Sequence, residues 1–120
     1  MPFLFENLLV YQKALDFADE VCQFTSRFDR GFGFLADQLN RAALSISTNL
    51  AEGNGRFTPA DRRNFFIIAR GSLLECVPLL ELARRRGQLS DADHAQLKAR
   101  LEEISRMLWG LISGIENRAR

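Results

Sequence analysis

Histidine, cysteine and proline are scarce in this 120-residue chain, and the scarcity excludes several kinds of active site. The one histidine, His94, cannot build an HExxH zinc site or the paired Glu-x-x-His motifs of di-iron bundles. Any Ser-His-Asp triad would need the same histidine, and no nucleophile-elbow sequence accompanies it. We therefore expect no metal, no cofactor and no enzyme activity, and we interpret His94 as an exposed helix residue.

The two cysteines, Cys22 and Cys76, lie far apart and form no CxxC pair, which is typical of a chain kept reduced. No apolar run approaches the ~20 residues that a membrane-spanning helix needs. Residues 1–6 also lack the basic start of a signal peptide. These absences predict a cytoplasmic protein with no membrane partner.

Net charge is small as well. Sixteen basic and fifteen acidic residues leave a formal charge of +1, too little for a global field that attracts nucleic acid. The distribution is uneven, because residues 27–70 carry seven arginines against four acidic residues. Arginine suits forked contacts with phosphate, so this stretch is a candidate basic surface, with an ordinary solvated surface as the alternative. The candidate nucleic-acid contacts are Arg56, Arg62, Arg63 and Arg70.

What the chain does have is four segments of helical periodicity, separated by glycine and proline. The first covers about 7–28, and its apolar arc spans roughly half of the helix. That arc comprises Val10, Tyr11, Ala14, Leu15, Phe17, Ala18, Val21, Cys22, Phe24 and Phe28. The second covers about 34–53 and has a narrower apolar face. That face comprises Leu35, Leu39, Ala42, Ala43, Ile46 and Leu50.

Capping residues mark the other two helices. Thr58 and Pro59 predict the start of the third as N-cap and first helical residue, and Gly87 predicts its end. We expect Pro78 to kink this helix or to free one carbonyl. Ser90 predicts the start of the fourth helix, whose apolar residues form a heptad seam. The seam comprises Leu97, Leu101, Ile104, Leu108, Leu111 and Ile115.

Four helices joined by short loops predict a single all-α domain over residues 1–120, an antiparallel up-down-up-down four-helix bundle. The apolar residues of the third helix lie all the way round it, and the chain holds ten phenylalanines. A lone bundle would leave a large apolar patch exposed. We therefore expect a homo-oligomer.

Two polar features each have two interpretations. Gly53 and Gly55 could form a phosphate-binding loop, but no strand precedes them and no Gly-Lys-Ser/Thr follows, so a helix C-cap and turn is favoured. Residues 84–86 are three arginines that could contact phosphate or an acidic partner. Complementing the helix dipole explains them equally well.

A polar stripe follows one side of the second helix, formed by Arg41, Ser45, Asn49 and Glu52, and the third helix offers Ser72 and Glu75. The stripe is either plainly exposed or part of a satisfied network within or between subunits. We predict a structural network in which Arg41 or Asn49 bridges to Glu75. On this hypothesis none of these residues is catalytic.

Three blocks of sequence also resemble a known family: Phe5-Glu6-Asn7-Leu8 with Val10-Tyr11-Gln12, residues 38–53 (QLNRAALSISTNLAEG), and residues 69–75 (ARGSLLE). In order and spacing they are similar to the bacterial four-helix bundle proteins encoded by intervening sequences of 23S rRNA genes, often labelled S23 ribosomal protein. The resemblance implies an antiparallel four-helix bundle that assembles as a ring-shaped homopentamer, without established enzymatic activity. It also implies kinship with the accessory variability protein of diversity-generating retroelements, whose basic barrel is associated with binding nucleic acid and a reverse transcriptase.

Together these observations predict a non-catalytic, oligomeric bundle that acts as a scaffold and binds RNA or a nucleic-acid-handling protein. The alternative is a purely structural protein-interaction module with no affinity for nucleic acid. A small-molecule enzyme ranks third among these hypotheses, because the sequence offers it no metal cluster, no catalytic triad and no phosphate loop.

Overall fold

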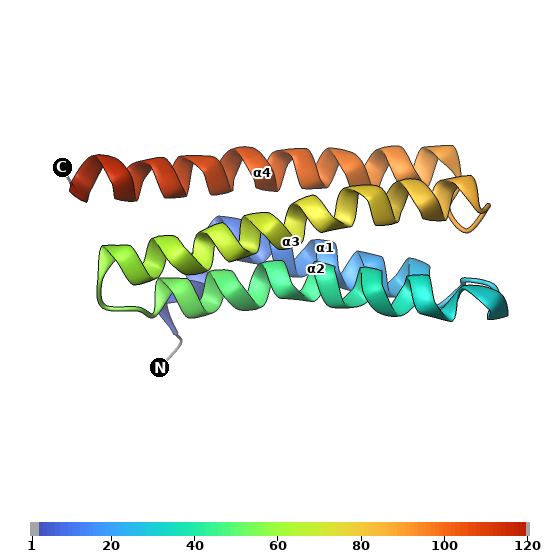
Figure 1. The fold of residues 1–120 in the computed structure, drawn as a ribbon, viewed down its shortest axis with the longest axis horizontal. Helices are drawn as coiled ribbons and strands as arrows, with labels where there is room; N and C mark the ends of the chain where they lie inside the picture. The colour runs from blue at the N-terminus through green and yellow to red at the C-terminus, as the bar shows by residue number, and fades with distance from the viewer. Residues whose placement is uncertain (1–2, 120) are drawn as a thin grey trace.

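Four long antiparallel helices make up the fold of the computed structural model, which describes the backbone of residues 3–119 and the side chains of residues 3–115 (Figure 1). They are α1 (Leu9–Thr25), α2 (Gly33–Asn54), α3 (Pro59–Arg85) and α4 (Asp91–Ala119). Two short 3-10 turns, η1 (Leu4–Asn7) and η2 (Arg30–Phe32), precede α1 and α2. The bundle measures 48 × 29 × 20 Å, and the predicted all-α up-down-up-down architecture is confirmed.

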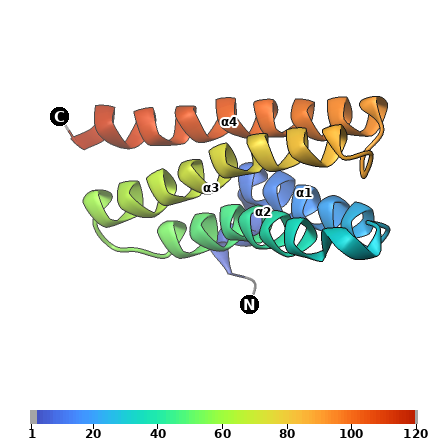
Figure 2. The same ribbon diagram turned by 45° about the vertical axis from the view of Figure 1, so that its right-hand side comes forward.

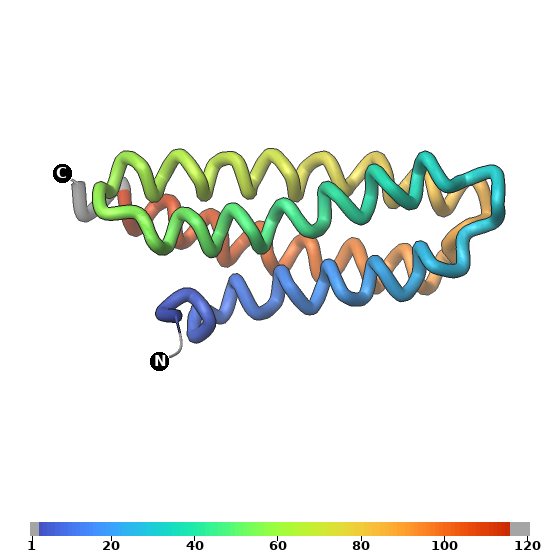
Figure 3. Tube along the Cα trace, turned by 90° about the horizontal axis from the view of Figure 1, so that it is seen from below, coloured from blue at the N-terminus to red at the C-terminus, as the bar shows by residue number. Residues whose placement is uncertain are grey.

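The order of the helices around the bundle sets which surfaces are free. Figure 2 shows α3 lying between α2 and α4. Figure 3 shows that α1 stops short of the end formed by the α2–α3 connection, while the other three helices continue past it. The η1 turn lies in this region and packs against α1 and α2. This end of the bundle is therefore built partly by the N-terminal segment.

Local capping chemistry fixes the ends of α3 and the start of α4. Thr58 Oγ1 accepts a hydrogen bond from the Asp61 N–H at 3.1 Å, and Pro59 occupies the first turn. Gly87 adopts a φ of 74°, the left-handed conformation that favours glycine just after a helix. Ser90 Oγ accepts from the Asp93 N–H at 3.0 Å. All three predictions are confirmed, and α3 continues as one helix across Pro78.

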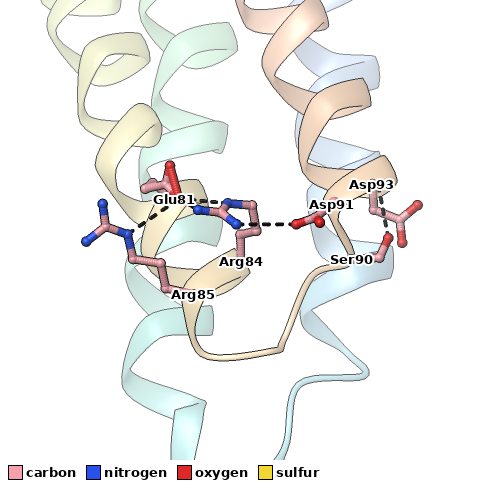
Figure 4. A network of polar contacts seen from close by, with 6 residues as sticks. All are labelled: Glu81, Arg84, Arg85, Ser90, Asp91 and Asp93. Carbon is pink, nitrogen blue, oxygen red and sulfur yellow. Dashed lines mark hydrogen bonds and ion pairs between the residues drawn. The ribbon is translucent and has the colours of Figure 1, made fainter.

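Charged side chains close the α3–α4 turn (Figure 4). Arg84 lies 2.6 Å from Glu81 and 3.3 Å from Asp91, so that it bridges the last turn of α3 and the first turn of α4. Arg85 also pairs with Glu81, at 3.6 Å. The Arg84 hydrogen bond lowers the pKa of Glu81 below its ordinary value. These contacts favour a structural role for Arg84 and Arg85.

The first helix is shorter than predicted. It ends at Thr25, whose hydroxyl donates to the Asn40 side chain at 2.8 Å. The chain then turns through η2, and the Asp29 N–H donates to Gln88 Oε1 at 2.6 Å. The expected continuation to residue 28 is wrong because contacts with α2 and with the α3–α4 connection replace the last helical turn.

The core lies along the inner faces of all four helices. The apolar face predicted for α2 is entirely buried. In α1 the predicted arc is too wide, because Leu15 and Cys22 are exposed. In α4 every predicted seam residue is buried except Leu111, which is half-buried, and the buried Ile112 takes its place. A straight helix of 3.6 residues per turn drifts from a strict seven-residue repeat, which explains the shift.

The predicted C-cap and turn lie at Gly55, whereas Gly53 is a buried residue inside α2. A Cβ atom at this position would lie 2.7 Å from Phe66 Cε1 and 2.9 Å from Phe65 Cβ. The helix ends one residue later, at Asn54, and Gly55 caps it in the right-handed conformation. Glycine is present here because α2 and α3 approach closely.

Candidate subunit and nucleic-acid interface

A chain of hydrogen bonds joins the polar stripe of α2 to α3. Asn49 Nδ2 donates to Ser45 Oγ at 3.0 Å, and the Ser45 and Ser72 hydroxyls lie 2.8 Å apart. Ser72 Oγ donates in turn to the Ile68 carbonyl at 3.3 Å. With Ser45 as donor to Ser72, each hydroxyl both gives and receives one bond. The half-buried part of the stripe is thus satisfied within one chain.

Arg41 and Glu75 do not meet in this way. Both side chains are exposed, and among the described residues no hydrogen bond or ion pair joins either of them to another side chain. Glu52 is exposed too and pairs with Arg56, four residues on, at 3.5 Å. The predicted bridge from Arg41 or Asn49 to Glu75 is therefore absent within the chain. A bridge between subunits stays a prediction.

Two stripes with seven-residue spacing carry these charges on the outer surface. On α3 the stripe is Ile68, Glu75 and Leu82, and all three are exposed. On α2 it is Phe34, Arg41 and Thr48, which are exposed as well. Residues seven apart lie two helical turns apart on one face. Since Ser45 contacts Ser72 and the helices are antiparallel, Arg41 lies at the level of Glu75.

The outer side of α3 is rich in apolar side chains. Five of its large apolar residues are each 38–47% exposed: Ile67, Ile68, Leu74, Val77 and Leu82. α3 packs against both α2 and α4, yet these five side chains of it stay partly exposed within the described chain. Exposed apolar surface of this kind is typical of an interaction site.

Three of the four candidate arginines lie at one end, and Arg70 lies farther along α3. Arg56 lies in the α2–α3 connection, with its guanidinium 4.5 Å from the centre of the Phe65 ring. Arg62 is half-buried at the start of α3, whereas Arg63 and Arg70 are exposed and seven residues apart. The connection that carries η2 lies at the opposite end of the bundle (Figure 1). The seven arginines of residues 27–70 therefore do not form one surface.

The described residues do not gather into a metal site. In the part of the chain that the structure describes, no three His, Cys, Asp or Glu side chains are grouped as a metal site would need. Both cysteines are free: Cys22 is exposed, and burial, assisted by the charge of Glu75, raises the pKa of Cys76 to about 12. None of the described helices is both long and apolar enough to cross a membrane.

Sequence reasoning missed the one aromatic residue of the α2–α3 connection, Phe57. Phe57 is 97% exposed, and it borders a hollow that Phe3 and Phe5 also line. The signal was available, because Phe57 lies between Gly55 and Pro59, where a large apolar residue has no helix to bury it.

The fold and its surfaces define an all-α antiparallel bundle whose distinctive residues lie on outer helix faces and at one end. Comparison with known proteins gives the family: residues 6–110 match the family model described as 23S rRNA-intervening sequence protein, and the chain belongs to that family. The family resemblance predicted from the three sequence blocks is confirmed.

A solved structure supports the same fold. It is the crystal structure of a protein with unknown function from the S23 ribosomal protein family of Bacteroides thetaiotaomicron. The two chains are similar with a TM-score of 0.82 at 24% sequence identity, over 86% of this chain and 97% of the other. A search of curated proteins finds none that matches.

Proposed function

We propose that this protein is a non-catalytic scaffold that assembles from copies of itself through the outer surface of α2 and α3. The observation that carries the proposal is the exposed apolar side of α3, which a single bundle leaves uncovered. Arg41 and Glu75 lie within the same surface and lack partners among the described residues. In a contact between copies, each side chain would face an oppositely charged side chain of the other copy, partly shielded from water. The family resemblance implies five copies, and the free cysteines fit a reducing cytoplasm.

Light scattering coupled to gel filtration tests the assembly. We expect about five times the chain mass of 13.6 kDa. Ile68→Asp should dissociate the assembly, because it places a carboxylate on the proposed interface. Leu15→Asp is the matched control, since Leu15 is similarly exposed but lies on α1. A wild-type mass of 13.6 kDa at micromolar concentration refutes the proposal.

The paired charges have their own test. Arg41→Ala and Glu75→Ala should each weaken the assembly and lower its melting temperature. If the two residues contact each other across subunits, the double variant should lose less than the sum of the single losses. Single variants that keep wild-type assembly and stability but lose RNA binding would instead place these residues in a binding site.

A second function, RNA binding, is favoured by the arginines at the α2–α3 end. Arg56, Arg62 and Arg63 lie within eight residues of one another, and Arg70 continues along the face of Arg63. Phosphate contacts make affinity fall with salt, by a slope of about −0.7 in log K against log salt for each phosphate on a single strand. Titrations with structured rRNA fragments over a salt series should show this slope. No binding at low salt would favour the purely structural alternative.

A further inference from the structure

A hollow of about 580 Å³ lies at the end of the bundle where the N-terminal segment meets the α2–α3 connection. Aromatic rings from both segments line it, namely Phe3 and Phe5 from one and Phe57 from the other. These segments are distant in sequence, so the fold brings the rings together. The volume falls within the range of sites that hold small planar ligands.

The rings offer free faces. Phe57 is 97% exposed and Phe3 is 67% exposed. Phe3 already stacks on Phe5, with ring centres 5.7 Å apart and planes only 13° from parallel. Phe5 in turn contacts Tyr11 edge-on, at 5.0 Å, which anchors the stack to α1. An added flat ring can therefore extend a stack that is already held in place.

The polar groups of the hollow suit a base better than a phosphate. Glu52, Asn54 and Asp61 line it, and the two carboxylates repel phosphate. Carboxylates do accept hydrogen bonds from the exocyclic amine of cytosine, and an amide both donates and accepts. Of the arginines that would bind phosphate, Arg56 lines the hollow, and Arg62 and Arg63 directly follow the lining residue Asp61 in the first turns of α3.

We infer that this hollow binds unpaired bases of a single-stranded RNA, with Phe57 as the stacking platform and the α2–α3 arginines on the backbone. The inference rests on the RNA-binding function proposed above and specifies its ligand. Single-strand binding sites commonly combine aromatic platforms with a basic track, because every base has a π-face. Packing the solvent-exposed Phe57 ring against a base also removes apolar surface from water.

Fluorescence anisotropy with a labelled 12-nucleotide oligocytidine tests the inference, with an abasic strand of equal length as the comparison. Phe57→Ala should weaken oligocytidine binding about 5- to 150-fold, the range that base stacking is worth. Phe57→Trp should restore it, and the abasic strand should bind wild type and both variants equally. Because the Phe57 side chain is exposed, these substitutions should leave the circular dichroism spectrum and melting temperature unchanged.

Trp109→Ala is the matched control, because Trp109 is an exposed aromatic residue on α4, outside the hollow, at 65% exposure. Oligocytidine binding that survives Phe57→Ala but falls in Arg62→Gln and Arg63→Gln overturns the stacking platform and leaves RNA binding standing. No binding of either strand by wild type at low salt overturns both.

Discussion

Replacing Gly53 with alanine should destabilise the protein, although alanine is the better helix former. The added methyl group would lie 2.7 Å from Phe66 Cε1 and 2.9 Å from Phe65 Cβ. The Phe66 ring is only 2% exposed, so it has little room to move away. The Phe65 Cβ is bonded directly to the backbone of α3. Relief therefore requires α2 and α3 to separate.

Two effects of opposite sign decide the magnitude. Alanine in place of glycine inside a helix stabilises by about 1 kcal/mol. Overpacking a well-packed contact costs about 1–3 kcal/mol. Since neither phenylalanine can yield cheaply, we expect the upper part of that range and a net loss of about 1–2 kcal/mol. For a domain of this size that loss lowers the melting temperature by roughly 3–10 °C.

Thermal unfolding followed by circular dichroism measures the change, at one fixed protein concentration because assembly would make the midpoint depend on concentration. Gly110→Ala is the matched control: the position is helical, lies on α4 away from the proposed contact between copies, and has nothing within 4 Å of an added Cβ. The control should gain up to about 1 kcal/mol. A Gly53→Ala variant as stable as this control would refute the close approach of α2 and α3.

Three further predictions concern smaller features. Cys22 should react with a thiol reagent at pH 8, while Cys76 stays unreactive until the protein unfolds. Because burial raises the pKa of Cys76 to about 12, the thiol's contribution to the free energy of unfolding should be lost as pH rises from about 9 to 12. Melts of Cys76→Ala over the same pH range should lack this loss of stability. Ser45→Ala and Ser72→Ala should each cost about 0.5–1.5 kcal/mol in urea melts, with a double-variant loss below the sum. Thr58→Ala removes the cap of α3 and should cost about 0.5–2 kcal/mol; an unchanged denaturation midpoint would count against the cap.

Helix ends could be predicted where the deciding contacts are local. The Thr58 cap and the left-handed Gly87 each involve residues within a few positions, so the sequence alone contains the signal. The end of α1 depends instead on Thr25 meeting Asn40, fifteen residues away on another helix. Gly53 depends on a phenylalanine of α3 in the same way. Periodicity carries no information about such partners.

The same distinction applies to the polar stripe. Helical spacing places Arg41, Ser45 and Asn49 along one side of α2, and this could be predicted. Which of them finds a partner on α3 depends on the register of the two helices. That register pairs Ser45 with Ser72 and leaves Arg41 and Glu75 at one level but apart on the outer surface. The stripe thus divides into an inner part satisfied within the chain and an outer part open to another molecule.

In an antiparallel bundle, the net charge counted over a stretch of sequence does not describe the charge of any one surface. Residues 27–70 include both connections of α2, and a helix of 22 residues separates them by about 33 Å. Arg27 and Arg30 therefore lie at the end opposite to Arg56, Arg62 and Arg63, well beyond the ~8 Å over which exposed charges act on each other in physiological salt. The basic character that matters for a nucleic acid is that of one end alone. A net charge of +1 does not by itself argue against the proposed RNA binding, because Arg56, Arg62 and Arg63 lie near one another at the α2–α3 end, whatever charges the opposite end carries.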